Sequence, residues 1–155
     1  MHFRVYSETY NAISRGERPA PGCEAVISMT SYSATTEGIT VTASPVYLDG
    51  QSDSLQRKFV FAYFIRIENR RTERVQLLRR HWFICDKTGN IKEVEGEGIV
   101  GKQPSLGPGE VHHYSSYCSI ETFEGYMEGT YLMESEDGKK FEVAIPRFNL
   151  RAASN

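Results

Sequence analysis

The order of hydrophobic and polar positions along the chain is typical of short β-strands separated by turns. In the clearest segment, KFVFAYFIRIEN at residues 58–69, successive positions are apolar as far as Ile65, after which Arg66 and Glu68 flank Ile67. Because neighbouring side chains of a strand point to opposite faces, this pattern predicts a central strand that is covered on both faces. Six further segments are predicted to hold strands: residues 29–48, 74–86, 91–98, 110–117, 125–134 and 141–148.

Turn sequences separate these segments, among them DKTGN at residues 86–90 and SEDGKK at residues 135–140. No segment has the apolar period of a helix of ordinary length. Seven or eight short strands at this spacing predict an all-β fold, an antiparallel β-sandwich, and not a sheet that alternates with helices.

The first 28 residues differ from the rest of the chain. They mix Ser, Arg, Glu, Pro and Gly without a sustained period, and RGERPAPG at residues 15–22 has the composition of a loop. We therefore expect residues 1–28 to be a poorly structured N-terminal extension and residues 29–155 to form the sandwich domain.

Length and charge limit the classes of function. A chain of 155 residues fits one domain with a core of its own, and a formal net charge of −2 gives no general attraction to nucleic acid. Arginines gather between Arg66 and Arg80, but Glu68 and Glu73 lie among them and no aromatic stacking pattern accompanies them. The expected role of this segment is a solvated strand face and turn, with no nucleic-acid partner.

The cysteines indicate a reducing compartment. Cys23, Cys85 and Cys118 are odd in number, widely separated and without a Cys-x-x-Cys pair, which argues against a disulfide framework and against a thiolate zinc site. No apolar run approaches the length that spans a bilayer, and the N-terminus lacks the apolar region of a secretory signal. The expectation is a cytoplasmic protein without a membrane partner.

One glycine pattern has a chemical meaning in other folds. Gly96, Gly98 and Gly101 have the spacing Gly-x-Gly-x-x-Gly of a dinucleotide-binding turn. Such a turn needs a helix after it, and the sequence KQPSLGPGEV at residues 102–111 contains too many Pro and Gly residues for one. A Walker loop is excluded because Gln103 follows Lys102. Two interpretations remain: the glycines are bulges or bends of the sheet, or their amides and Lys102 form an anion-binding nest.

The histidines offer no clear metal site. His112 and His113 are adjacent, so on a strand they point to opposite faces and do not chelate one ion. His81 is interpreted as a structural histidine that is hydrogen-bonded in or near the sandwich. No metal site and no cofactor are predicted.

No catalytic residue is predicted either. Ser115, Ser116, Ser119 and Cys118 lie near the histidine pair, but the nucleophile-elbow sequence is absent. The carboxylates are interpreted as solvated, and this group contains Glu93, Glu95, Glu97 and Glu110. The aromatic and methionine side chains expected in the core are Trp82, Tyr114, Tyr126, Met127 and Tyr131.

Several motifs in order resemble the ApaG family, between about Gly38 and Leu150. They are Arg-His-Trp at residues 80–82, Gly-Glu-Gly-x-Val-Gly-x-x-Pro at residues 96–104 with Ile99 as the variable position, Pro-Gly at residues 108–109, Tyr-x-Ser at residues 114–116 and Gly-x-Met-x-Gly-x-Tyr at residues 125–131. Two positions depart from the family pattern: Tyr117 stands where Gly is usual, and Phe123 follows Thr122 where Pro is common.

The resemblance implies a fibronectin type III-like or immunoglobulin-like β-sandwich. It also implies an association with cobalt and magnesium efflux or tolerance, and with a neighbouring gene for a diadenosine tetraphosphate hydrolase. Related domains in larger eukaryotic proteins resemble binding modules for partner proteins. The resemblance supplies no catalytic residues.

The resulting hypothesis is a non-enzymatic module that binds an unidentified protein partner. The predicted binding loop comprises Gly96, Glu97, Gly98, Gly101, Lys102 and Pro104, together with Arg80. One alternative is a nucleotide or pyrophosphate binder that uses the same loop for a phosphate-containing small molecule. Another is a factor that acts directly on cobalt or magnesium.

The domain boundary predicts the effect of truncation. A protein that starts at Met29 is expected to keep the unfolding midpoint of the full chain, because residues 1–28 are predicted to add little to the core. Guanidinium denaturation of both proteins measures this, and a large loss of stability on truncation would place part of the fold before Met29.

Overall fold

The computed structural model describes residues 30–152, which form strands and one 3₁₀ turn, Asp49–Gln51. The strands are β1 (Tyr32–Thr36), β2 (Ile39–Tyr47), β3 (Phe59–Asn69), β4 (Val75–Asp86), β5 (Ile91–Glu97), β6 (Ser105–Leu106), β7 (Val111–Ile120), β8 (Glu124–Ser135) and β9 (Lys140–Arg151). Every segment predicted as a strand contains one. The predicted extension, residues 1–28, and the predicted start of the domain at Met29 lie outside the described residues.

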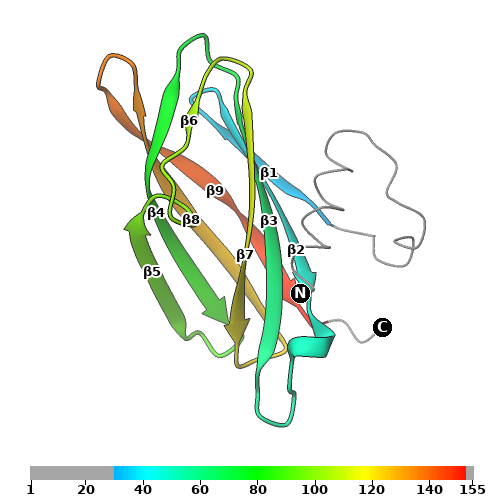
Figure 1. Cartoon of the computed structure of the whole chain (residues 1–155). Helices are drawn as coiled ribbons and strands as arrows, with labels where there is room; N and C mark the ends of the chain where they lie inside the picture. The colour runs from blue at the N-terminus through cyan, green and yellow to red at the C-terminus, as the bar shows by residue number, and fades with distance from the viewer. Residues whose placement is uncertain (1–29, 153–155) are drawn as a thin grey trace, which may run out of the picture.

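The strands form two antiparallel sheets, which confirms the predicted all-β sandwich (Figure 1). One sheet has the order β1-β2-β3-β7, and the other has the order β5-β4-β8-β9 with the short β6 paired to β4. The orders β2-β3-β7 and β4-β8-β9 correspond to A-B-E and C-F-G of immunoglobulin-like sandwiches. The fibronectin type III-like subclass stays a prediction.

The main core lies between the sheets. Its most deeply buried side chains include Phe61, Ile65, Met127, Tyr131 and Phe148. On β3 the other face is covered as well, because Val60, Ala62 and Phe64 form a second buried cluster with Leu48. The prediction that β3 is covered on both faces is therefore confirmed.

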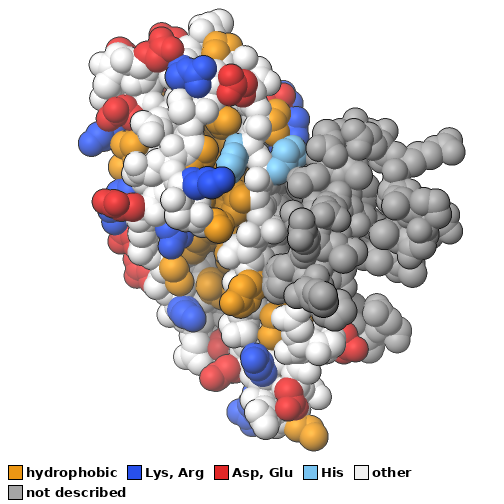
Figure 2. Space-filling view, in the orientation of Figure 1, with side chains coloured by type: hydrophobic (Ala, Val, Ile, Leu, Met, Phe, Trp, Pro, Cys, Tyr) orange, Lys and Arg blue, Asp and Glu red, His pale blue; other side chains and the backbone are white. Residues whose placement is uncertain are grey.

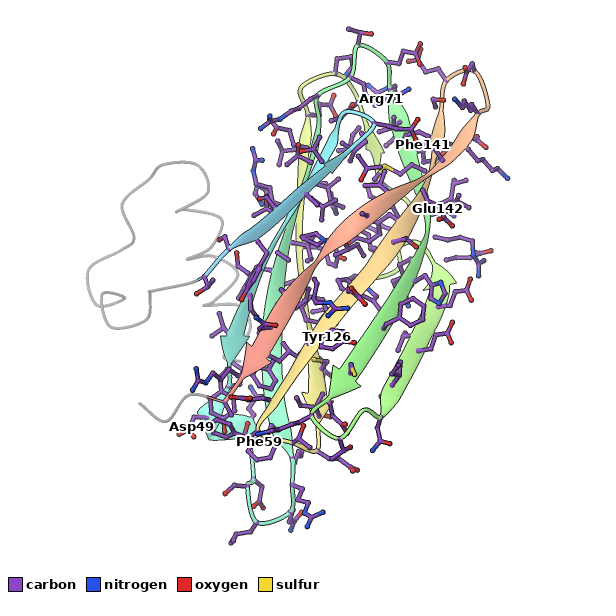
Figure 3. All side chains as sticks on the ribbon, turned by 180° about the vertical axis from the view of Figure 1, so that it is seen from behind. Asp49, Phe59, Arg71, Tyr126, Phe141 and Glu142 are labelled. Atoms are coloured by element: carbon purple, nitrogen blue, oxygen red, sulfur yellow. The ribbon has the colours of Figure 1, made fainter. Side chains whose placement is uncertain are left out.

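One long side of the sandwich is closed by direct packing of the two sheets. In Figure 3, which views the molecule from behind, β9 crosses beside β1 and β2, and Arg71 and Phe141 lie together at one end. The Arg71 guanidinium lies over the Phe141 ring at 4.9 Å, and the Ala144 amide donates to the Thr36 hydroxyl at 3.2 Å. Arg71 also donates to the Glu37 carbonyl, so the loop after β3 joins both sheets at this end.

The opposite long side is bounded by β5 and β7, the end strands of their sheets. We call it the open side; it faces the viewer in Figure 1. The outer edge of each of these strands has no neighbouring strand among residues 30–152.

Two details of the strands depart from simple sequence patterns. Strict alternation would place Leu77 on the face opposite Trp82 and Ile84, but a β-bulge between Leu77 and Arg79 puts all three side chains in the core. Tyr126 was predicted in the core but is only half-buried, and the Arg147 guanidinium lies over its ring at 4.0 Å. No helix among residues 30–152 is long and apolar enough to cross a membrane.

A close contact between strands predicts one large effect on stability. A Cβ at Gly129 would lie 2.0 Å from the His81 carbonyl oxygen, where β8 pairs with β4. Gly129→Ala is therefore expected to lower the free energy of unfolding by about 3 kcal/mol, because the two strands must separate. Gly50→Ala is the control, since nothing lies within 4 Å of a Cβ there. Urea denaturation of both variants measures the difference, and equal midpoints would contradict the strand contact.

Candidate functional site

The predicted binding loop is an ordered tight turn at the end of β5. The Ile99 and Lys102 backbones exchange two hydrogen bonds of 2.8 and 3.0 Å, and the two residues between them, Val100 and Gly101, have φ angles of 47° and 76°. Two positive φ angles in a two-residue connection define a type I′ hairpin turn. The glycine pattern thus serves a hairpin at this point, not a turn into a helix.

The bulge in β4 anchors this loop to the sheet. Leu78 has no partner in the β4–β8 register, and its carbonyl accepts hydrogen bonds from the Gly98 amide at 2.8 Å and from the Gln103 side chain at 3.0 Å. The Leu77 amide in turn donates to the Pro104 carbonyl at 3.0 Å. At Gly98, with φ of 62°, a Cβ would lie 2.3 Å from the Lys102 carbonyl oxygen, so only glycine fits.

Arg80 holds the start of the loop from the inner face of the sheet. It lies opposite Gly96 in the β4–β5 register, and a Cβ at Gly96 would lie 3.1 Å from the guanidinium. The guanidinium donates to the carbonyls of Glu97 and Gly98, both at 2.9 Å. Its charge is therefore half-buried beside carbonyl oxygens and has no carboxylate within ion-pair distance among residues 30–152.

These hydrogen bonds bear on the two interpretations of the glycines. The amides of Gly98, Ile99 and Lys102 already donate to backbone carbonyls, so they do not form a set of free donors around an anion. The local geometry favours the structural interpretation for Gly96, Gly98 and Gly101. What the loop offers to a ligand is its side chains: Lys102 and Val100, of which Val100 is 66% exposed.

The open side collects basic side chains that lack carboxylate partners. Seven arginines elsewhere in residues 30–152 are in ion pairs, namely Arg66, Arg70, Arg71, Arg74, Arg79, Arg147 and Arg151. The two without such a pair, Arg57 and Arg80, both lie on the open side, as do Lys58, Lys92 and Lys102. Figure 2 shows hydrophobic side chains along this face, with basic and histidine side chains beside them.

The position of each basic side chain follows from the strand register. Residues directly opposite in an antiparallel pair share a face, and Lys92 is opposite the buried Ile84. Arg80 lies two residues before the buried Trp82 on the same strand. Both charges therefore lie toward the gap between the sheets, and not toward the outer face of β4 and β5.

A pocket of about 500 Å³ occupies one end of the open side. Its apolar part is formed by Ile84, Ile91 and Ile120, and its basic part by Arg57, Lys58 and Lys92. Asp86 and Glu121 supply the negative charges. Asp86 accepts hydrogen bonds within its own turn from the hydroxyl and amide of Thr88 and from Asn90, which lower the pKa of its carboxyl.

Polar groups line the gap behind these charges. The Tyr114 and Tyr131 hydroxyls are hydrogen-bonded across the two sheets, and burial raises the pKa of both phenols, so both are neutral. Burial and the nearby Lys102 charge lower the pKa of His112, which favours its neutral form. Burial raises the pKa of the Cys118 thiol to about 12, so this cysteine is not a reactive nucleophile.

One cluster on the outer face of β4 and β5 was not found from the sequence. His81 lies opposite Glu95 and beside Glu93, and its Nε2 is 2.5 Å from a Glu93 carboxylate oxygen. Ligand-forming atoms of these three residues lie within 4.8 Å of one another. The carboxylates were interpreted as solvated and His81 as a structural histidine. The signal that connects the three residues is the two-residue spacing of Glu93 and Glu95, which puts both on one face of β5, combined with the β4–β5 register, which puts His81 opposite Glu95.

Comparison with known proteins identifies the family. The ApaG domain matches residues 49–135 of this chain. Protein ApaG of Paramagnetospirillum magneticum is 51% identical over 119 residues, which cover 77% of this chain and 92% of that protein. Protein ApaG of Brucella abortus is 48% identical over 119 residues, with the same coverage of both chains. The crystal structure of a Bordetella pertussis protein named ApaA superposes with a TM-score of 0.72 at 44% identity, covering 73% of this chain and 92% of that one. The chain belongs to the ApaG family.

Proposed function

We propose that this protein is a non-enzymatic module that binds an acidic, extended segment of a partner protein along its open side. Family and fold support a small binding module. The observation that carries the finer proposal is the uneven pairing of the arginines: within residues 30–152 the two arginines without an ion pair, Arg57 and Arg80, both lie on the open side.

The distribution of charge favours a long ligand over a compact one. Lys102 and Arg80 lie at the loop after β5, and Arg57, Lys58 and Lys92 lie at the pocket at the other end of the open side. The edge strand β7 has ten residues, which corresponds to roughly 33 Å. Charges spread over such a length match a row of carboxylates better than one nucleotide, and complementary charge raises the rate and specificity of association.

The backbone at the open side favours the same ligand. The end strands β5 and β7 present edges that have no neighbouring strand among residues 30–152, and an extended peptide can add to such an edge. Exposed apolar side chains near these edges, Ile91 and Tyr117, supply contact area that a polyphosphate does not use.

Backbone strain at Val100 supports an interaction at the turn. Val100 is β-branched, has a φ of 47° and is 66% exposed, so its side chain is unfavourable both for the turn and for contact with water. Strained residues at exposed positions are common at binding sites. Contact with an apolar group of the partner would bury this exposed valine and offset the cost of its backbone conformation.

The nucleotide-binding and metal-tolerance hypotheses remain alternatives to the peptide-binding proposal. A nucleotide or pyrophosphate ligand at Lys102 and Arg80 remains an alternative because it uses the same charges, although the hydrogen-bonded amides of the loop do not favour it. The cytoplasmic location and the link to cobalt and magnesium tolerance remain predictions.

A charge-neutralising double variant tests the proposal. Full-length protein is expected to bind a fluorescent peptide of ten glutamates, and Lys92→Gln combined with Lys102→Gln is expected to weaken binding about tenfold, because two exposed charge pairs contribute about 1.4 kcal/mol together. Fluorescence anisotropy at low and physiological salt measures the affinity, which should fall as salt rises.

Lys139→Gln combined with Lys140→Gln is the matched control, because it changes the net charge equally at exposed positions of the β8–β9 hairpin. An equal loss in both double variants would show only a general charge effect and would refute the open side as the site. Titration with pyrophosphate separates the alternative: saturable amide shifts confined to residues 96–104 would support an anion site in place of a peptide site.

The strain at Val100 predicts a stabilising substitution. Val100→Asn is expected to raise the free energy of unfolding by about 1 kcal/mol, because Asn tolerates the left-handed conformation that this turn requires. Ile91→Asn is the control: Ile91 is 63% exposed and is not among the residues with positive φ, so its replacement brings no such gain. Thermal unfolding measures both variants, and an unchanged or lower stability of Val100→Asn would contradict strain at this residue.

A further inference from the structure

The outer face of the β4–β5 hairpin carries a cluster of one histidine and two glutamates that is separate from the open side. His81 points away from the core because it alternates with the inner-facing Arg80 and Trp82, and Glu95 lies directly opposite it. Glu93 is two residues from Glu95 on β5, so it shares the same face. The three ligand-forming atoms come from two paired strands and lie within 4.8 Å of one another.

We infer that His81, Glu93 and Glu95 bind a first-row divalent transition metal such as Zn²⁺. One imidazole nitrogen and two carboxylate oxygens are ligands that Zn²⁺ accepts, and three protein ligands leave a position for water or for another molecule. Mg²⁺ is a poorer match, because it prefers an all-oxygen octahedral shell. The set is a mixed nitrogen and oxygen group, not a cluster of carboxylates alone.

The geometry requires only small side-chain movements for coordination. The His81 ring lies beside Phe83, with ring centroids 4.5 Å apart, which restrains the imidazole on the sheet surface. Its Nε2 already faces Glu93 at 2.5 Å, so the metal replaces one hydrogen bond between two ligands. Ligands on paired strands are positioned more firmly than ligands on loops.

One neighbouring charge competes with the metal. Arg79 lies 3.9 Å from Glu95 and also 3.9 Å from Glu97. Both ion pairs are long and partly exposed, so each contributes little to stability. When Glu95 turns to the metal, Glu97 remains as the partner of Arg79, and the arginine charge stays neutralised.

Isothermal titration of the untagged full-length protein with Zn²⁺, and separately with Mg²⁺, tests the inference. The expected result is one Zn²⁺ site whose affinity falls at least about tenfold in His81→Gln and in Glu93→Gln, with much weaker binding of Mg²⁺. Glu97→Gln is the matched control, since it removes the next carboxylate on the same face and is expected to change the affinity less than twofold.

Amide shifts on addition of Zn²⁺ locate the site and show whether each variant is folded. Shifts centred on His81, Glu93 and Glu95 are expected, and they should be absent in His81→Gln although its spectrum stays dispersed. Unchanged Zn²⁺ affinity in His81→Gln combined with Glu93→Gln would overturn the inference, as would shifts centred on His112 and His113. Neither result affects the proposed peptide site, because its basic side chains lie on the open side and not on the outer face of β4 and β5.

Discussion

The β-bulge at Leu78 is the constraint on which the rest of the candidate surface depends. With Leu77 in the core, strict alternation would turn residue 81 inward and residue 80 outward. The extra residue reverses this, so Arg80 enters the gap between the sheets and His81 lies on the outer face. The same bulge presents the Leu78 carbonyl to Gly98 and Gln103, which fixes the loop after β5. One inserted residue therefore decides which chemistry each face of the hairpin presents.

The two long sides of the sandwich differ in the partners of their arginines. On the closed side the Arg71 guanidinium contacts the Glu37 carbonyl, the Glu73 carboxylate and the Phe141 ring, and it joins strands that are distant in sequence. On the open side the partners of the Arg80 guanidinium within residues 30–152 are two carbonyl oxygens, which do not compensate its net charge. A half-buried charge is stabilised by a carboxylate more than by neutral acceptors. A ligand that brings carboxylates to the open side therefore gains a favourable electrostatic interaction with the Arg80 guanidinium.

Most of the fold could be predicted from the sequence, because strand alternation and turn residues are local signals. The strand at residues 58–69 was predicted with both faces covered, and β3 is buried in that way. The candidate site was less predictable, because it depends on contacts between segments distant in sequence. Tyr126 is an aromatic residue of the kind common in cores, but its burial depends on which face of β8 it occupies and on the Arg147 guanidinium that covers its ring. The glycine loop was found from its sequence, whereas Arg57 belongs to the surface because the loop before β3 and the strand β5 line the same pocket, which the sequence does not reveal.

The β4–β5 hairpin joins the two proposed sites through its register. On one face Gly96 makes room for the Arg80 guanidinium, and on the other Glu95 meets His81. A shift of one residue in this pairing would exchange the faces of every side chain on β5 and would place carboxylates beside the core. The buried Trp82 opposite Val94 opposes such a shift, because the inner face of β5 must stay compatible with the core. The hydrophobic core thus sets the register, and the register keeps the basic inner surface and the mixed His–Glu outer surface on opposite faces of one hairpin.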